Sequence, residues 1–116
     1  MFIRLYVYSN NNIESKNISK EVVKPLENYI EKIKYIANKP YWKIDGMYVV
    51  EIKIKLYDKL NQNYFNKFLK EISNDWSILG INEDELIASD TNCMELEMVY
   101  ICIDYKTEIK FDCDEF

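Results

Sequence analysis

The alternation of apolar and polar positions predicts strands and helices in turn along the first third of the chain. FIRLYVY at Phe2–Tyr8 alternates strictly, which is the period of a half-buried strand, and SNNNIESKNIS after it is typical of a polar loop. Between Lys20 and Ala37, apolar residues recur every three or four positions, so this range is expected to form an amphipathic helix with Ser19 available as its N-cap. Pro25 lies inside this range, so we expect regular helix from near Lys24 or a kinked first turn.

The middle of the chain predicts a hairpin followed by a second helix. Asp45 and Gly46 stand between two runs rich in β-formers, and glycine supplies the positive φ that a tight turn needs. The arm after the turn alternates up to Leu56, with apolar side chains on its even-numbered positions from Tyr48. Asn61 or Asn63 can cap the helix that follows. Its apolar stripe consists of Phe65, Phe68, Leu69, Ile72 and Trp76.

Two further strands are expected after Gly80. ELIAS predicts a short strand and CMELEMVYICIDY a longer one, joined by turn residues from Asp90 to Asn92. The tail to Phe116 is expected to add an edge strand or to fray. Alternation in the longer strand sets one face against the other, namely Met94, Leu96, Met98 and Tyr100 against Glu95, Glu97, Val99 and Ile101.

This order, β-α-β-β-α-β-β, predicts one α+β domain over residues 1–116. Helices with a single apolar stripe and alternating strands suit an antiparallel or mixed sheet that is covered by two helices on one face. We therefore expect a ferredoxin-like fold or a related sandwich. With 48% apolar residues, the chain can bury a core without metals or disulfides.

Charge is distributed unevenly along the chain. Residues 1–70 carry 13 basic and 7 acidic side chains, whereas residues 71–116 carry 2 basic and 13 acidic ones. The last third is therefore a source of negative potential, which repels nucleic acid and anionic membrane and favours a basic partner.

The inventory of reactive residues argues against an enzyme. The chain has no histidine and only two glycines, so it contains no glycine-rich phosphate-binding loop, no G-x-S-x-G serine motif and no H-E-x-x-H zinc-protease motif. Glu95 and Glu97 stand two apart on one predicted strand face, but alternating glutamates are far commoner on the wet face of a strand than in acid–base pairs. The acids of residues 83–90 lack the spacing of a calcium loop. We expect no catalytic residue, metal or cofactor.

The cysteines and the N-terminal segment predict a cytoplasmic protein. Cys93, Cys102 and Cys113 are odd in number and form no C-x-x-C pair, which favours reduced thiols. The apolar N-terminal segment from Met1 to Tyr8 does not resemble a signal peptide, because Arg4 interrupts it. No apolar run approaches the roughly 18 residues of a membrane span.

The open face of the predicted sheet raises an alternative. Aromatic and basic side chains gather there as on RNA-binding sheets, but the aromatic-basic motif of those sheets is missing and the acidic third opposes a polyanion. Nucleic acid is therefore not the expected partner. The residues concerned are Tyr6, Tyr8 and Tyr57 with Arg4, Lys53 and Lys55.

The acidic segment is the predicted partner-binding surface. Trp76 continues a helical stripe and is expected to pack inward, whereas unpaired acids cannot enter a core. A fixed cluster of acids beside aromatic residues is suited to recognise a basic surface. The predicted binding residues are Glu83, Asp84, Glu85 and Asp90, with the outward acids Glu95 and Glu97.

The stretch NKFLKEISNDWSILGINEDELIASD, followed by MELEMVYICI, resembles the C-terminal half of small immunity proteins from bacterial polymorphic toxin and contact-dependent inhibition systems. The resemblance covers about half of the chain. It implies a cytoplasmic inhibitor that binds and occludes one cognate toxin domain, often a basic nuclease. Two alternatives stay open: a regulatory or phage inhibitor that mimics the charge of DNA, and a small-ligand-binding ferredoxin-like domain.

Overall fold

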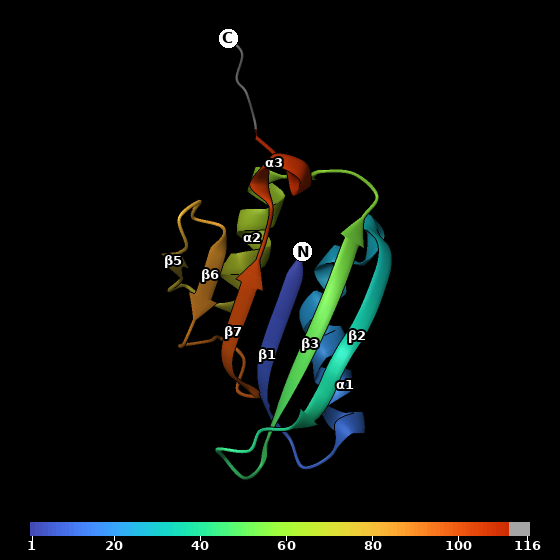
Figure 1. Cartoon of the computed structure of the whole chain (residues 1–116), viewed down its shortest axis with the longest axis vertical. Helices are drawn as coiled ribbons and strands as arrows, with labels where there is room; N and C mark the ends of the chain where they lie inside the picture. Colours follow the sequence, from blue (N-terminus) through green and yellow to red (C-terminus); the bar gives the residue numbers. More distant parts are fainter. Residues whose placement is uncertain (112–116) are drawn as a thin grey trace.

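The computed structural model describes residues 1–111, which form an α+β fold, as the sequence predicts (Figure 1). The helical segments are α1 (Asn12–Val23), the 3-10 helix η1 (Lys24–Tyr29), α2 (Gln62–Ile72) and α3 (Tyr105–Glu108). The strands are β1 (Phe2–Tyr8), β2 (Ile30–Pro40), β3 (Met47–Leu56), β4 (Leu60–Asn61), β5 (Ser77–Leu79), β6 (Glu85–Ala88), β7 (Leu96–Cys102) and β8 (Ile109–Lys110).

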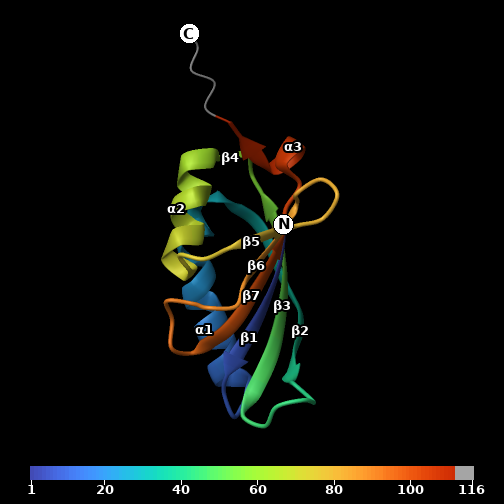
Figure 2. The ribbon, with the colours of Figure 1, turned by 90° about the vertical axis from the view of Figure 1, so that its left-hand side faces the viewer.

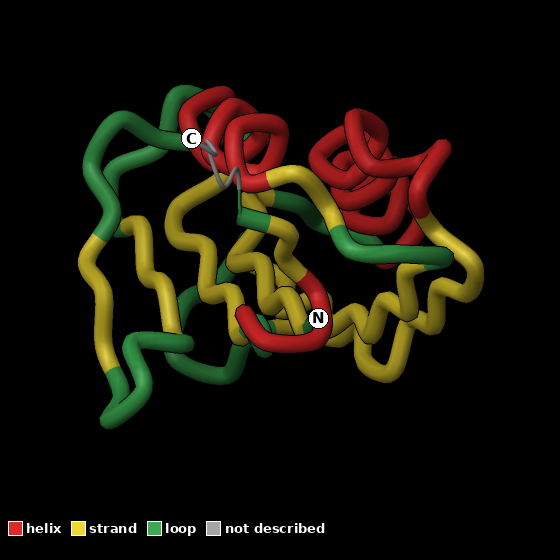
Figure 3. Tube along the Cα trace, turned by 90° about the horizontal axis from the view of Figure 1, so that it is seen from above, coloured by secondary structure: helices red, strands yellow, loops and turns green. Residues whose placement is uncertain are grey.

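Six of the strands form one sheet in the order β2-β3-β1-β7-β6-β5, and β4 pairs with β8 in a second, smaller one. Every pairing in the larger sheet is antiparallel, whereas β4 and β8 are parallel. Helices α1 and α2 lie side by side over one face of the larger sheet (Figures 2 and 3). Neither long helix covers the opposite face, and within residues 1–111 only the short α3 lies at one end of it (Figure 2). We call it the helix-free face, and most of its side chains are open to solvent or a ligand.

The core lies between the sheet and the two long helices. In β1 the predicted alternation is confirmed, since Ile3, Leu5 and Val7 are fully buried. Helix α2 contributes two phenylalanines and Ile72 from its apolar face. Helix α1 instead turns two serines inward: Ser19 Oγ donates to the main-chain oxygen of Ser15, and Ser15 Oγ to Asn38. Small, satisfied hydroxyl groups allow α1 to approach the sheet closely at no polar cost.

Helix α1 lies where a loop is predicted, and that prediction is wrong. The side chain of Asn11 accepts a hydrogen bond of 2.8 Å from the Glu14 N–H, so Asn11 rather than Ser19 is the N-cap. Asparagine is common both in turns and at helix N-caps. The three asparagines at residues 10–12 therefore do not show from sequence alone whether a loop or a helix follows. Pro25 sits in the first turn of η1, where its missing N–H costs nothing.

The predicted helix from Lys20 to Ala37 is correct only in its first part, which contains the end of α1 and the 3-10 helix η1, and is wrong from Ile30 on, where strand β2 begins. The ladder with β3 shifts register between Ile30 and Lys32 and again between Tyr35 and Ala37. Each bulge adds one residue, so apolar side chains recur at intervals of three instead of two and imitate helical spacing. Main-chain pairing with β3 extends from Ile30 to Pro40 and holds this segment as a strand.

The second helix is confirmed, and the hairpin is confirmed in part. Gly46 has φ +77°, but the first arm ends at Pro40, so the turn is not tight: residues 41–46 connect the arms, and Trp42 among them is 84% exposed. Asn61 caps α2 by accepting from the Asn63 N–H. Trp76 lies beyond the end of α2 and is half-buried against the core, with its ring N–H donating to the Leu69 oxygen at 2.9 Å.

Strand β7 departs from simple alternation. A register shift opposite Tyr6 and Val7 changes the face, so the buried residues are Leu96, Val99 and Ile101 and the predicted faces are wrong before the shift. Strands β4 and β5 and helix α3 were not predicted. Strand β8 supplies the predicted tail strand only in part, and the remaining tail with Cys113 lies outside the described residues.

Candidate functional site on the helix-free face of the sheet

One row of six residues crosses the helix-free face, and each residue is paired directly with the next one on the neighbouring strand. From β2 to β5 the row consists of Lys34, Lys53, Phe2, Cys102, Glu85 and Leu79. The adjacent row contains the fully buried Ile3, Ile52 and Ile101, so this one points away from the helices. Lys53 and Glu85 are separated by three strand spacings, or about 14 Å. The face is therefore basic over β2 and β3 and acidic over β6.

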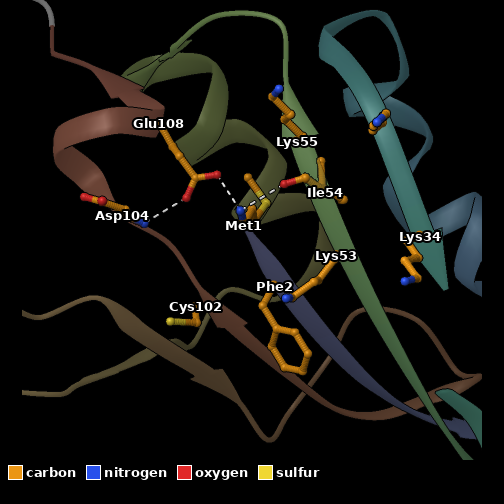
Figure 4. A pocket seen from close by; sticks show the side chains of 10 residues that line it. Met1, Phe2, Lys34, Lys53, Ile54, Lys55, Cys102, Asp104 and Glu108 are labelled. Atoms are coloured by element: carbon orange, nitrogen blue, oxygen red, sulfur yellow. Dashed lines mark hydrogen bonds and ion pairs between the residues drawn. The ribbon is translucent and has the colours of Figure 1, made fainter. Parts of the chain in front are cut away.

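The lysine cluster consists of Lys32, Lys34, Lys53 and Lys55. Lys32 is paired across the strands with Lys55, and Lys34 with Lys53. All four line a cavity of about 450 Å³ (Figure 4). Its other lining residues are Met1, Phe2, Ile54, Cys102, Asp104 and Glu108. Within residues 1–111, the one ion pair of the cluster joins Lys55 to Glu31 at 3.0 Å.

Arg4 occupies the centre of the face. Its Nε donates to Glu51 at 2.7 Å, and its guanidinium lies 5.4 Å from the ring centre of Phe2 and 5.5 Å from that of Tyr100. The two rings meet edge to face at 6.1 Å. A cation held by a carboxylate and two aromatic rings has a fixed orientation, so Arg4 separates the two charged regions as a rigid element.

The acidic edge consists of Leu79, Ile81, Glu83, Asp84 and Glu85. Gly80 and Glu83 both have positive φ, +90° and +54°, and the Glu83 N–H donates to the Gly80 oxygen at 3.1 Å. A side chain added at Gly80 would come within 2.6 Å of Asp84 and 2.9 Å of Glu85, so both carboxylates converge on this glycine. Figure 2 shows the turn on the helix-free side, next to α3.

Apolar side chains are exposed beside these carboxylates. Leu79 is 46% exposed on the same face as its partner Glu85, and Ile81 in the turn is fully exposed. Ile78 is 58% exposed but pairs with the buried Leu86, so it lies on the opposite face of β5. An exposed apolar patch bordered by charges is typical of a surface that contacts another protein.

The structure brings Glu83, Asp84 and Glu85 together, but it places the other predicted site residues elsewhere. Asp90 follows the opposite end of β6, where its main-chain oxygen accepts from Ser73 Oγ. This end of β6 is fixed to the end of α2 through that bond.

Glu95 and Glu97 belong with Asp90 rather than with the acidic edge. Glu97 accepts from the Tyr8 hydroxyl, and Glu95 from Cys93 Sγ at 3.1 Å. Cys102 is the cross-strand partner of Glu85 and is five residues beyond Glu97 on the same strand. Glu97 and Glu85 are therefore about 16 Å apart. The predicted site is thus two acidic groups at the two ends of the β6–β7 pair.

Sequence reasoning placed Lys53 and Lys55 on the open face of the sheet but missed Lys32, Lys34 and Tyr100 as members of a site. The alternating KIK at residues 53–55 was visible, but its cross-strand partners were assigned to a helix. The Tyr100 hydroxyl donates to Glu85 at 2.6 Å, and this bond chiefly raises the pKa of Tyr100 to about 12. The spacing of Glu85 and Tyr100 in the sequence does not predict this hydrogen bond, which depends on the pairing of β6 with β7.

The thiols on these surfaces are poor nucleophiles. Burial, followed by the nearby carboxylates of Asp84 and Glu85, raises the pKa of Cys102, and burial raises that of Cys93. Both thiols are free and stay protonated at neutral pH. The arrangement is thus suited to binding by charge and apolar contact rather than to attack by sulfur.

Two other properties concern the described part of the chain. Among residues 1–111, no three His, Cys, Asp or Glu side chains are grouped so that they could hold a metal ion. No helix within the same residues is both long and apolar enough to cross a membrane.

Similarity to known proteins adds nothing to this description. No protein-family model matches this chain, and no curated protein or solved structure is similar enough to it to count as a match.

Proposed function

We propose that this chain is a non-enzymatic immunity protein that binds and neutralises a basic bacterial toxin domain in the cytoplasm. The observation that carries the proposal is the acidic edge, where exposed Leu79 and Ile81 adjoin the carboxylates of Glu83 to Glu85. Carboxylates speed encounter with a basic surface, and apolar side chains supply affinity once water is excluded. Against a nuclease, these carboxylates take the place of substrate phosphates.

Strand β5 offers a second means of attachment. It pairs with β6 on one side and is the last strand of the six-stranded sheet. Its three residues are exposed, so the free edge can accept a strand from a partner through main-chain hydrogen bonds. The partner's basic side chains would then lie beside the turn at Gly80.

The topology supports a relation to the ferredoxin-like arrangement and shows where the acidic edge would belong in it. Four strands lie in the order β7-β1-β3-β2, with α1 following β1 and α2 following β3. This is the order of a split β-α-β pair of units. Strands β5 and β6 extend that core beyond β7, and the acidic edge is part of the extension.

The second acidic group fits within the same interface. A standard interface covers about 800 Å² on each partner, which spans roughly 30 Å and includes both ends of the β6–β7 pair. We therefore assign Asp90, Glu95 and Glu97 to its margin, where charge acts mainly on the association rate.

The test is charge reversal at the acidic edge with Glu83→Lys, Asp84→Lys and Glu85→Lys combined. Binding of the toxin domain encoded directly upstream is measured at two ionic strengths. Like charges across an interface cost several kcal/mol, so we expect a dissociation constant at least ~100-fold weaker, with slower association at low salt. Unfolding free energy should fall by about 1–2 kcal/mol, because Glu85→Lys also removes the acceptor of the Tyr100 hydroxyl.

The matched control is the same charge change outside strands β5 to β7 and the pocket that Glu95 lines, with Glu14→Lys, Glu27→Lys and Asp58→Lys combined. All three are exposed, and binding should stay within a few-fold of wild type. Equal weakening in both variants would reduce the effect to net charge and contradict the assignment. A variant of the acidic edge that still binds fast and tightly at low salt would contradict the recognition surface. An upstream gene that encodes no toxin would favour the charge-mimicking regulator.

A further inference from the structure

The lysine cluster concentrates positive charge more than folding requires. Directly opposed residues in an antiparallel pair have Cβ atoms about 5 Å apart, and alternate residues on a strand lie about 7 Å apart. The two pairs, Lys32 with Lys55 and Lys34 with Lys53, thus form a small rectangle of cations. Like charges that face each other across strands are destabilising. A chain that keeps two such pairs side by side gives up stability at this place.

Protection of a sheet edge accounts for only half of the cluster. Lys32 and Lys34 belong to β2, the edge strand, where lysines discourage pairing with other chains. Lys53 and Lys55 belong to β3, which has β2 on one side and β1 on the other. No free edge exists there to protect, so the second half of the cluster needs another explanation.

The carboxylates that share the cavity are committed elsewhere. Glu108 contacts the amino group of Met1 at 2.5 Å and accepts from the Asp104 N–H at 2.9 Å. Asp104 caps α3 by accepting from the Lys106 N–H at 3.0 Å. Figure 4 shows Glu108 turned toward Met1 across the cavity from Lys55. In the described part of the chain, Lys32, Lys34 and Lys53 are thus left without an ion pair.

The geometry points to a binding site for a small molecule that carries two or more phosphate groups, formed by Lys32, Lys34, Lys53 and Lys55. Lysine ammonium groups bind phosphate as point charges, and four on a rectangle suit several phosphoryl groups in a chain. The cavity of about 450 Å³ has the size of a small-molecule site, with the Phe2 ring at its wall. This site lies apart from the acidic edge and does not depend on the proposed toxin binding.

The probe is inorganic tripolyphosphate, titrated into the full chain by calorimetry at low and high salt. The variant Lys34→Gln with Lys53→Gln should bind at least tenfold more weakly. Its control, Lys39→Gln with Lys59→Gln, changes net charge equally at exposed lysines outside the cavity and should stay within twofold of wild type. Without ligand, the unfolding midpoint of the site variant should equal or exceed that of wild type, because like-charge pairs are relieved. A lower midpoint would mean that the lysines serve the fold and would overturn the site.

Two ligand sources share this chemistry, a free phosphate chain and a nucleotide. If ATP binds more tightly than tripolyphosphate and Phe2→Leu removes the difference, the site takes a nucleotide; equal affinities indicate the phosphate chain, and both results support the site. No binding at millimolar tripolyphosphate and low salt would overturn the proposal. Equal weakening in the control variant would do so too, as would a single-stranded oligonucleotide whose affinity exceeds that of ATP and grows with length. Lys32→Gln with Lys55→Gln provides a second variant with the same expectations.

Discussion

Strand β2 has 11 residues and pairs with β3 along almost its entire length, whereas β5 at the other edge of the same sheet has 3 residues and pairs only with β6. The long edge exposes lysines, which oppose strand addition, and the short edge exposes isoleucine and leucine. The lysines of β2 oppose pairing with another chain, whereas only its shortness limits such pairing at β5. The comparison teaches that β2 is held in place by a long ladder and that β5 is the less protected edge.

The largest expected difference between the two edges is in stability. Ile52 of β3 is fully buried, and Ile52→Ala should cost about 2–5 kcal/mol because it leaves a cavity in the core. Ile78 of β5 is 58% exposed, and Ile78→Ala should cost at most about 1 kcal/mol. Urea unfolding of both variants measures the two losses. Equal losses would show that β5 packs as firmly as β3 and would remove the contrast.

The two glycines sharpen the comparison, since each serves one edge. Gly46 in the β2–β3 hairpin and Gly80 in the β5–β6 turn have φ of +77° and +90°. Replacement by alanine should cost about 1–2 kcal/mol at either position, because the left-handed conformation is strained for any residue with a Cβ. Thermal or denaturant unfolding measures this loss.

The two alanine variants should differ in what they displace. A Cβ at Gly46 meets only a side-chain oxygen of Asn10 at 3.8 Å, whereas one at Gly80 pushes aside the carboxylates of Asp84 and Glu85. Gly80→Ala should therefore also disturb the hydrogen bond from Tyr100 to Glu85, and Gly46→Ala should not. An unchanged Tyr100 titration in Gly80→Ala would contradict this link.

Sequence reasoning recovered the elements whose signals are local. Strand β1, the Asp45-Gly46 turn, helix α2 with its Asn61 cap and strand β6 were predicted because alternation, turn chemistry and capping act over a few residues. Strand β2 was mistaken for helix because two bulges gave its apolar residues a helical interval. Such bulges depend on the register with the partner strand β3, which the spacing of residues within β2 does not reveal.

The candidate site was predictable to a similar extent. The segment of Glu83 to Glu85 was identified from its charge, and the structure groups these residues on one turn. Asp90, Glu95 and Glu97 lie at the other end of the β6–β7 pair. An extended strand advances about 3.3 Å per residue, so acids that are close in the sequence are carried to opposite ends of the pair. The lysine cluster could not be found without the correct register of β2 on β3.

The smallest expected effect concerns two tyrosines, one near each edge. A hydrogen bond to Glu85 chiefly raises the pKa of Tyr100 to about 12, whereas burial alone raises that of Tyr35 on β2. A folded-state pKa above the unfolded value of 10.0 gives stability that is fully present below pH 10 and is lost as the pH rises toward about 12. Glu85→Gln should lower the Tyr100 pKa toward 10 and shorten this window.

Glu85→Gln should leave Tyr35 unchanged, because no carboxylate contributes to its shift. The measurement is the ring ¹³Cζ shift of each tyrosine between pH 9 and 12.5, with Tyr100→Phe to identify the signal. Tyr35 pairs with the buried Ile52 and lies under Lys16 of α1, so it serves as a control on the helix-covered side of the sheet. A response confined to Tyr100 means that the charge at position 85 acts locally through the hydrogen bond. If both tyrosines respond equally, the change has disturbed the fold as a whole, and the assignment of the Tyr100 shift to Glu85 is contradicted.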